Sequence, residues 1–429
     1  PTASFFIFIA LCITVMYFWE KKVPGGNPRK GILKLNTTRG DRLFVSLLSA
    51  AFIHLAWLGL TDFNLWIATI LSSMFAIFVF KYVWFMSKIV IIGAGAMGSA
   101  FAVPCADNSN EVFLVGSFLE DSVIEEIKNL NNFHPILKTQ LPKNIKVLKF
   151  SEFNNDEIKN NIDLLVIGVS SKGIEWIGNE ISEFYKPSID ILLLTKGLAL
   201  IDDKFETLAE KLRNILNKQG VNNAKISAVG GPCLANGLAN RIHSSVVLAN
   251  KDIDVVKKIG RMISTKYYST EYSDDLMGVE VCAATKNIYS MLIGASEGLS
   301  SNDLSSEIKK KYYLNTAASL IYKAVSEMKN LSKKLNGKEE TAYGLAGLGD
   351  LHVSSAGGRN SKMGYYLGQG HLFTDAKVKF MKEITVEGAD LAFAIGPKIL
   401  KEFKKEEFPL LISVIEAICK NKKLEINWV

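Results

Sequence analysis

Hydrophobic residues fill three long runs in the first 85 positions of the chain, and polar segments separate these runs. The runs cover residues 4–19, 43–60 and 65–80, the last continuing to Trp84. A helix needs about 20 apolar residues to cross the hydrocarbon core of a bilayer, and each run comes close to that length. The pattern predicts a membrane domain over residues 1–85 with about three transmembrane helices. His54, inside the second run, either marks a functional site or forms a hydrogen bond within the helix bundle.

The polar segment between the first two runs, residues 20–42, is basic. It carries Lys21, Lys22, Arg29, Lys30, Lys34, Arg39 and Arg42, against Glu20 and Asp41. Short loops rich in lysine and arginine stay on the cytoplasmic side of a membrane. We therefore expect this loop in the cytoplasm, residues 61–64 as a short outer turn, and the chain after the third run in the cytoplasm again, where nicotinamide cofactors are found.

A different pattern begins directly after the third run. Lys88–Ile92 is a β-branched apolar run that predicts a buried parallel strand, and residues 99–103 continue as a helix. Between them, glycines at G-x-G-x-x-G spacing allow a tight turn, close approach of a pyrophosphate and close packing of helix on strand. The helix N-terminus adds N–H groups and a positive dipole end. The predicted cofactor contacts in this loop are Gly93, Gly95, Ala96, Met97 and Gly98.

The next 190 or so residues alternate between strand-like and helical patterns, which is typical of a doubly wound, mostly parallel α/β sheet. We expect strands at residues 111–115, 145–148, 163–169, 190–195 and 226–230, and a helix at 203–216. After about residue 275 the pattern is helical only, over residues 278–298, 308–331, 360–367, 386–403 and 409–419. The prediction is a Rossmann domain over residues 86–275 followed by an all-α substrate and catalytic domain over 276–429.

Composition narrows the possible functions. The net charge of +7 comes from scattered lysines and not from a basic stripe with interleaved aromatic residues, so nucleic acid is a poor candidate partner. The five cysteines are far apart and form no C-x-x-C pair, which argues against a disulfide framework or a zinc site. The five histidines show no metal-ligand spacing either, so we expect no metal.

Three stretches after the glycine-rich loop carry candidate chemistry. Lys196 directly follows a predicted strand, at the sheet edge where ligands bind in such folds. Lys286 lies on a helix rich in small residues, where a lysine that is only solvated has no reason to be. Asp350 and Arg359 lie in a glycine-rich segment. Asp350 could be a turn residue, and Arg359 could be an ordinary turn arginine or a ligand for an anion.

These stretches also carry a family resemblance. The motifs IGAGAMGSA, TKGL, GGPCLANGLA, GVEVCAATKN, GLGDL, GGRN and TVEGA occur in this order over residues 87–429. This part of the chain resembles bacterial NAD(P)-dependent glycerol-3-phosphate dehydrogenases, which interconvert dihydroxyacetone phosphate and sn-glycerol 3-phosphate. The resemblance implies NAD or NADP as cofactor, a small phosphorylated substrate and a homo-oligomer.

The resemblance also implies roles for individual residues. Lys286 matches the catalytic lysine, Lys196 a second active-site lysine, and Asp350 the acid that pairs with them. Two close ammonium groups would lower the pKa of one of them. The family's substrate-binding positions correspond to Asn287, Ser354, Arg359 and Asn360. Its cofactor-binding positions outside the glycine-rich loop correspond to Lys196, Arg359 and Glu387.

Some positions depart from the family pattern. Ser354 stands where the family usually has Thr, and Gly237 where it usually has Glu, which leaves room for a related phosphorylated polyol. The second strand ends in Val115-Gly116-Ser117, with no acidic residue for a ribose 2′-hydroxyl and no arginine for a 2′-phosphate. The choice between NAD and NADP therefore stays open.

The membrane segment has a resemblance of its own. Residues 36–66 are similar to small bacterial integral membrane proteins that accompany glycerol-uptake transporters. No linker separates Trp84 from Met86-Ser87, so the sequence indicates a fusion of two proteins, and Met86 could also serve as an internal start. We predict a glycerol-3-phosphate dehydrogenase of glycerophospholipid metabolism, anchored in the inner membrane and facing the cytoplasm, with a glycerol transporter as a possible partner. The alternatives are a dehydrogenase of another short phosphorylated polyol or hydroxy acid, and a nucleotide-sensing accessory subunit of a transporter.

Overall fold

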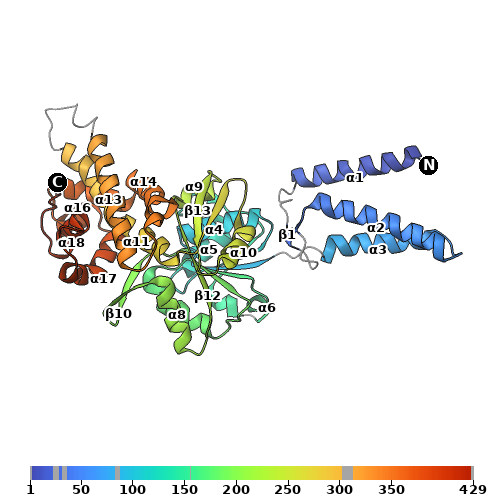
Figure 1. Ribbon diagram of the computed structural model, residues 1–429, viewed down its shortest axis with the longest axis horizontal. Helices are drawn as coiled ribbons and strands as arrows, with labels where there is room; N and C mark the ends of the chain where they lie inside the picture. Colours follow the sequence, from blue (N-terminus) through green and yellow to red (C-terminus); the bar gives the residue numbers. More distant parts are fainter. Residues whose placement is uncertain are drawn as a thin grey trace. The chain divides into compact units, whose positions relative to one another are not determined.

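The computed structural model describes residues 2–22, 29–30, 36–82, 87–154, 156–301 and 313–426 (Figure 1). The chain divides into two compact units, one of residues 1–87 with 105–111 and the other of residues 88–104 with 112–429. The predicted junction at residues 84–86, including the possible start at Met86, lies outside the described residues.

The first unit contains the three predicted helices. They are α1 (Thr2–Lys22), α2 (Arg39–Leu60) and α3 (Trp66–Tyr82), with a two-residue ladder of β1 (Arg29–Lys30) and β2 (Asn36–Thr37). Helix α2 starts at a capping box, in which Thr38 and Asp41 accept hydrogen bonds from each other's backbone N–H groups. His54 on α2 donates from Nδ1 to the carbonyl of Ala50, and its Nε2 lies 3.1 Å from Oγ1 of Thr69 on α3. The structure thus favours a structural role for this histidine.

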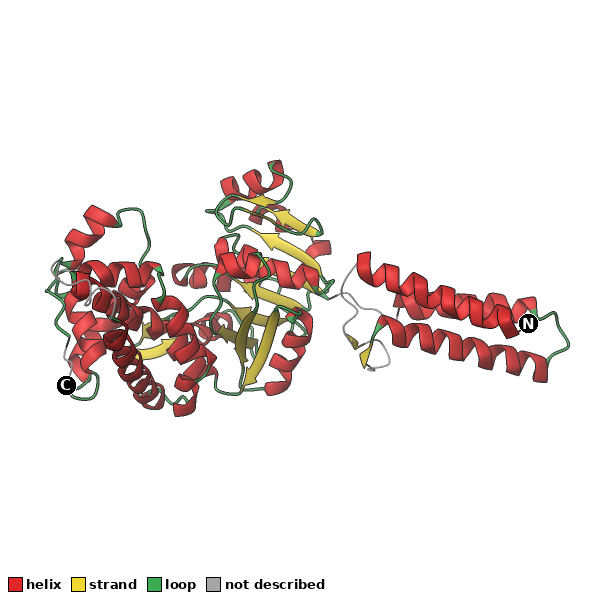
Figure 2. Ribbon diagram, turned by 90° about the horizontal axis from the view of Figure 1, so that it is seen from above, coloured by secondary structure: helices red, strands yellow, loops and turns green. Residues whose placement is uncertain are grey.

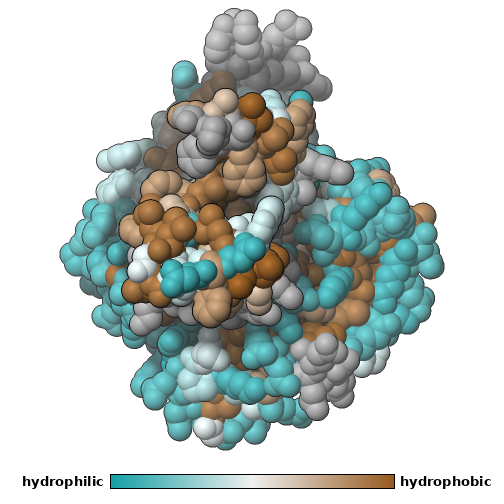
Figure 3. Space-filling view, turned by 90° about the vertical axis from the view of Figure 1, so that its right-hand side faces the viewer, coloured by the Kyte–Doolittle hydropathy of each residue, from teal (hydrophilic) through white to brown (hydrophobic). Residues whose placement is uncertain are grey.

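These helices expose their apolar side chains. On α2, Phe44, Phe52 and Leu55 are each about two-thirds exposed, and Figure 3 shows brown, hydrophobic atoms gathered over the helices of this unit. The segment Gly40–Leu60 is long and apolar enough to cross a membrane, and only 6% of its most apolar window is buried. Phe6–Trp19 and Trp66–Phe80 are shorter apolar helices. The exposed apolar surface of α2 within this unit is consistent with a membrane-associated segment.

The second unit is built on an eight-stranded sheet in the order β14-β13-β12-β9-β8-β3-β4-β7. The strands are β3 (Lys88–Ile92), β4 (Glu111–Val115), β7 (Ile145–Leu148), β8 (Leu164–Ile167), β9 (Asp190–Leu193), β12 (Lys225–Gly230), β13 (Ser244–Ala249) and β14 (Tyr268–Ser273). The pairs β3–β8, β8–β9, β9–β12, β4–β7 and β13–β14 are parallel, and β12–β13 is antiparallel. The predicted doubly wound, mostly parallel sheet is confirmed. Strands β13 and β14 were missing from the prediction.

Helices lie on both sides of this sheet (Figure 2). They are α4 (Ala96–Asp107), α5 (Asp121–Asn129), α6 (Asp156–Lys159), α7 (Ile174–Ser182), α8 (Leu208–Lys218), α9 (Ala235–Ala239) and α10 (Ile253–Ile263). Strand β8 is fully buried, as expected for a strand covered on both faces. A small ladder of β5 (Phe133–His134) with β6 (Thr139–Gln140) follows α5.

One predicted helix begins too early. Residues 203–207 belong to a hairpin of β10 (Leu198–Ile201) and β11 (Lys204–Thr207), and α8 starts only at Leu208. Asp202 and Asp203 both have positive φ, 48° and 57°, which matches the tight two-residue turns that join hairpin strands. Thr207 then caps α8 by accepting a hydrogen bond from the N–H of Glu210. The spacing of charged residues resembled that of an exposed helix face, but the tight turn at Asp202 and Asp203 makes these residues part of a hairpin.

The rest of the unit is helical, and lies to the left of the sheet in Figure 1. It contains α11 (Leu276–Ser301), α13 (Leu314–Lys334), α14 (Asp350–Ser355), α15 (Arg359–Gly368), α16 (Phe373–Phe380), α17 (Glu387–Glu402) and α18 (Pro409–Cys419). The five predicted helices are all present, although residues 308–312 of one lie outside the described residues. Helices α11 and α15 touch through their backbones, because a Cβ at any of four glycines would collide with a main-chain oxygen of the other helix. These are Gly294, Gly298, Gly364 and Gly368.

Candidate active site

A carboxylate and two ammonium groups form the centre of the site. Oδ2 of Asp350 lies 2.6 Å from Nζ of Lys196, and its Oδ1 lies 2.5 Å from Nζ of Lys286. Lys286 also donates to Oγ of Ser354 at 2.7 Å. Asp350 and Ser354 can both face Lys286 because they are four residues apart on α14, which puts them on the same helix face.

Three different elements position these side chains. Lys196 follows β9 at the carboxyl edge of the sheet, and Lys286 lies near the middle of α11. Asp350 begins α14 directly after a π-helical turn at residues Leu345–Gly349, at a helix N-terminus where a carboxylate is favoured. The side chains of Asp350 and Lys286 are 3% and 10% exposed, so water screens their interaction only weakly.

Burial and neighbouring charges shift the ionisation of this cluster. The pKa of the Lys286 ammonium is lowered to about 8, first by burial and second by the Lys196 ammonium, whereas Asp350 acts to raise it. Burial also acts to raise the pKa of the Asp350 carboxyl, but the two ammonium groups outweigh this effect and hold that pKa below its usual value. Lys286 therefore has the ionisation of a group that can give and take a proton near neutral pH.

A second group of predicted residues is joined to this cluster. Asn360 donates from Nδ2 to Oδ1 of Asn287 at 3.1 Å, and its own Oδ1 accepts from the N–H of Gly388 at 2.9 Å. Asn287 is the neighbour of Lys286 on α11, and Asn360 is the neighbour of Arg359 on α15. Arg359 forms an ion pair with Glu387 at the start of α17. All eight site residues predicted outside the glycine-rich loop thus belong to two linked clusters.

The glycine-rich loop is shaped to let a ligand approach its backbone. Gly93 has φ +114°, and a Cβ there would lie 2.6 Å from the carbonyl carbon of Gly168. A Cβ on Gly98 would collide with the carbonyl oxygen of Gly93, so helix α4 packs directly on the turn. At Gly95, by contrast, a Cβ would meet only Oε1 of Glu120, at 3.5 Å. The backbone is thus closed where it packs and open at Gly95, as pyrophosphate binding requires.

Two residues that the sequence did not single out hold this loop. Oε2 of Glu120 accepts the N–H of Ala94 at 3.0 Å, and the buried His134 donates from Nε2 to the carbonyl of Ala94 at 3.2 Å. The tautomer of His134 follows from its other nitrogen, which accepts the N–H of Leu137. Glu120 lies 22 residues after Gly98, close to the spacing at which Rossmann folds carry an acidic residue.

An acidic residue beyond the end of the second strand nevertheless contacts this turn. The strand itself ends without one, but Glu120 folds back and accepts the N–H and the hydroxyl of Ser117, both at 2.8 Å. The spacing from the glycine motif was the sequence signal that could have found it.

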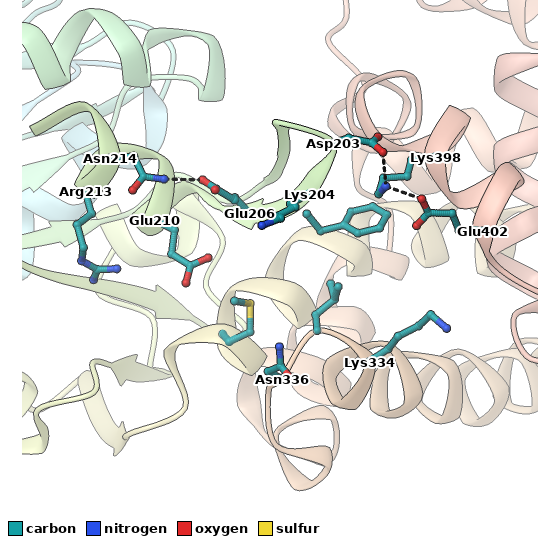
Figure 4. A pocket seen from close by; sticks show the side chains of 13 residues that line it. Asp203, Lys204, Glu206, Glu210, Arg213, Asn214, Lys334, Asn336, Lys398 and Glu402 are labelled. Carbon is teal, nitrogen blue, oxygen red and sulfur yellow. Dashed lines mark hydrogen bonds and ion pairs between the residues drawn. The ribbon is translucent and has the colours of Figure 1, made fainter. Parts of the chain in front are cut away.

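The structure also has a pocket of about 620 Å³ away from these clusters. Figure 4 shows its lining side chains from the β10–β11 hairpin, α8, α13 and α17. Lys398 reaches Asp203 at 3.1 Å and Glu402 at 2.5 Å, so charges in the pocket neutralise one another. All predicted site residues lie in the described part of the chain, and none of them lines this pocket.

Comparison with known proteins decides the family. Residues 88–256 match the family described as NAD-dependent glycerol-3-phosphate dehydrogenase N-terminus, and residues 275–427 match the corresponding C-terminus. The NADP(+)-dependent glycerol-3-phosphate dehydrogenase of Archaeoglobus fulgidus is 30% identical over 344 residues, 78% of this chain and 96% of that protein. The chain belongs to the NAD-dependent glycerol-3-phosphate dehydrogenase family.

Other members of this glycerol-3-phosphate dehydrogenase family agree. A glycerol-3-phosphate dehydrogenase [NAD(P)+] of Fusobacterium nucleatum is 27% identical over 340 residues, 79% of this chain and 94% of that protein. The solved glycerol-3-phosphate dehydrogenase of Coxiella burnetii shares the fold, with a TM-score of 0.62 and 24% identity, covering 78% of this chain and 95% of that one. Residues 1–83 match a family described as predicted small integral membrane protein (DUF2160). Both predicted resemblances are thus confirmed.

Membership of the glycerol-3-phosphate dehydrogenase family makes the chain an NAD(P)-dependent oxidoreductase with a Rossmann fold and a membrane-protein segment at its N-terminus. The glycine-rich loop fits such a cofactor, since Gly95 leaves its backbone open and the first turn of α4 offers N–H groups that have no partner within the helix.

Proposed function

We propose that the chain interconverts sn-glycerol 3-phosphate and dihydroxyacetone phosphate with NAD(P)(H). The observation that carries this proposal is the bridge from Lys196 through Asp350 to Lys286, linked by Asn287 and Asn360 to Arg359. The bound nicotinamide would supply or accept the hydride. The chain's own residues would handle the proton and the phosphate.

Lys286 is the proposed catalytic acid and base. During reduction, the ketone gains a hydride at carbon and becomes an alkoxide, which takes a proton from the Lys286 ammonium. During oxidation, neutral Lys286 accepts the hydroxyl proton as the hydride leaves. Asp350 keeps Lys286 oriented, and Lys196 adds positive charge where the alkoxide develops.

Arg359 and Asn360 are the proposed substrate-phosphate ligands. They occupy the first turn of α15, where free N–H groups and the helix dipole favour an anion. The guanidinium is about half exposed and pairs with Glu387, the proposed cofactor contact, so it is available to an incoming phosphate.

The reaction can be tested on the full chain in detergent. We expect dihydroxyacetone phosphate to drive oxidation of NADH or NADPH, and Lys286→Ala to abolish it, while Asn214→Ala at the separate pocket keeps it. Nucleotide binding without any turnover would leave the alternative of a nucleotide-sensing subunit. Turnover only with another phosphorylated ketone would favour a related dehydrogenase, in which Gly237, with only Ile242 near a Cβ at 3.8 Å, leaves space for a different substrate.

We also propose that residues 1–83 anchor the enzyme in the cytoplasmic membrane with the dehydrogenase part in the cytoplasm. The apolar, unburied surface of α2 and the basic loop before it support this orientation. Because NADH does not cross membranes, inside-out vesicles should oxidise it at once and right-side-out vesicles only after permeabilisation. Equal activity in both intact preparations would contradict the orientation.

A further inference from the structure

The turn after β4 presents an acidic side chain to the glycine-rich loop. Strands β3 and β4 are neighbours in the sheet, so the segment after β4 and the loop after β3 meet at the same edge. Oε2 of Glu120 is fixed by the backbone N–H groups of Ser117 and Ala94 and by the hydroxyl of Ser117, at 2.8–3.0 Å. Three donors on one oxygen hold the carboxylate in a single position.

The second oxygen of this carboxylate is available. Oε1 of Glu120 points to Gly95, lying 3.5 Å from where a Cβ would be, and within the described residues no donor bonds it and no lysine or arginine pairs with the side chain. The sequence from Val115 to Ile127 contains no lysine or arginine. A ligand at Gly95 thus meets a negative charge with a free acceptor.

Apolar side chains flank this acceptor. Phe118 and Leu119, which precede Glu120 in the turn, are 58% and 78% exposed. Phe118 packs edge-on against Trp176, with ring centroids 5.1 Å apart, so its ring has a fixed orientation. The turn thus offers an exposed apolar surface for a nucleotide base and one hydrogen-bond acceptor for a hydroxyl of the attached ribose.

We propose that Glu120 makes this enzyme select NAD(H) over NADP(H), with the adenosine end of the cofactor on the turn from Ser117 to Glu120. The free oxygen of Glu120 would accept a ribose hydroxyl, whereas the 2′-phosphate of NADP(H) would meet a carboxylate in a turn that contains no lysine or arginine. Family membership does not decide this choice, because the Archaeoglobus fulgidus relative is named NADP(+)-dependent. The inference rests on one part of the proposed function, the binding of NAD(P)(H), and does not depend on which substrate is reduced.

Direct binding tests the proposal without any turnover. Isothermal titration calorimetry of the full chain in detergent, with no substrate, gives dissociation constants for NADH and NADPH. We expect NADH to bind about 100-fold more tightly, since juxtaposed like charges cost several kcal/mol. Glu120→Gln, which removes the charge at constant shape, should reduce this ratio about tenfold or more.

A matched control separates a local effect from a general change of charge. Glu126→Gln removes one negative charge from an exposed position of α5, the helix that follows Glu120, and should leave the ratio unchanged. Leu119→Arg, with Glu120 intact, should strengthen NADPH binding selectively, and it serves as a second test if Glu120→Gln melts at a lower temperature.

The outcomes are distinguishable. Equal binding of the two cofactors, a preference for NADPH, or equal ratios in the wild type and Glu120→Gln would overturn the inference. A preference for NADH without turnover of dihydroxyacetone phosphate would refute the proposed reaction and leave the inference intact.

Discussion

Replacing Asp350 by asparagine tests the electrostatic coupling at the centre of the proposed site. The carboxylate oxygens lie 2.6 Å from Nζ of Lys196 and 2.5 Å from Nζ of Lys286. At an effective dielectric constant of about 20, two unit charges at this distance attract each other by about 6 kcal/mol. Loss of this attraction could lower the pKa of Lys286 by at most about four units. Relaxation around the amide reduces this, so we expect the pKa of Lys286 to fall by about two units, from about 8 to about 6.

The consequence for the reaction has a definite sign. Reduction of dihydroxyacetone phosphate needs protonated Lys286, so its rate should fall above pH 8 or so in the wild type and above about pH 6 in Asp350→Asn. At about pH 7.5 only a few per cent of Lys286 would stay protonated in the variant, and lost orientation adds to this effect. We expect a loss of about 100-fold in kcat for reduction at that pH.

The assay is the initial rate of NADH oxidation at saturating substrate from acid to alkaline pH. Asp190→Asn is the matched control, because Asp190 is also buried and pairs with Lys258 at 2.7 Å, but it lies at the amino end of β9, away from the site. Because this control uses the same substrate, any change of rate caused by titration of the substrate phosphate appears in both variants. If the rate of Asp350→Asn falls at the same pH as the wild-type rate and is only lower at every pH, the assigned role of Asp350 is refuted.

Three further predictions concern packing, stability and phosphate binding. Gly98→Ala should lower the melting temperature and abolish nucleotide binding, because its Cβ collides with the turn, whereas Gly95→Ala should fold normally and lose only nucleotide affinity; thermal unfolding and calorimetry separate the two. Burial raises the pKa of the Glu280 carboxyl to about 7, so the folded protein holds a proton that the unfolded chain releases near 4.5, and the free energy of unfolding should fall by about 3 kcal/mol between about pH 5 and pH 8. Glu280→Gln should remove this contribution in denaturant titrations, whereas the contribution of Glu327, whose pKa burial also raises to about 7, should stay; an unchanged slope would contradict the assignment. Arg359→Gln should raise the KM for dihydroxyacetone phosphate about 100-fold with little change in melting temperature, and Arg359→Lys should recover only part of the loss.

Local sequence was sufficient where one physical requirement dominated. The run Lys88–Ile92 is apolar at nearly every position because β3 is covered on both faces, and the glycine spacing follows from backbone contacts within a few residues. Lys286 was recognisable because its neighbours on α11 are small and apolar, as a buried face requires.

Other features depended on contacts that no local pattern records. Glu120 belongs to the glycine-rich loop only because β4 lies beside β3, so its role requires knowledge of the strand order. The position of His134 requires the fold of the whole segment after α5. In the β10–β11 hairpin, the positive φ angles of Asp202 and Asp203 decide the structure, and an acidic pair is a weaker signal for such a turn than Asn-Gly or Asp-Gly.

The glycine contact between α11 and α15 has a consequence for substrate size. One helix carries Lys286 and the other carries Arg359, and the backbones of the two touch at the four glycines. The reach from the proposed proton donor to the proposed phosphate ligand is therefore limited by main-chain contact at these glycines. Larger residues at Gly294 or Gly364 would separate the two helices and lengthen this reach, and the loss of close packing would lower the stability of the protein.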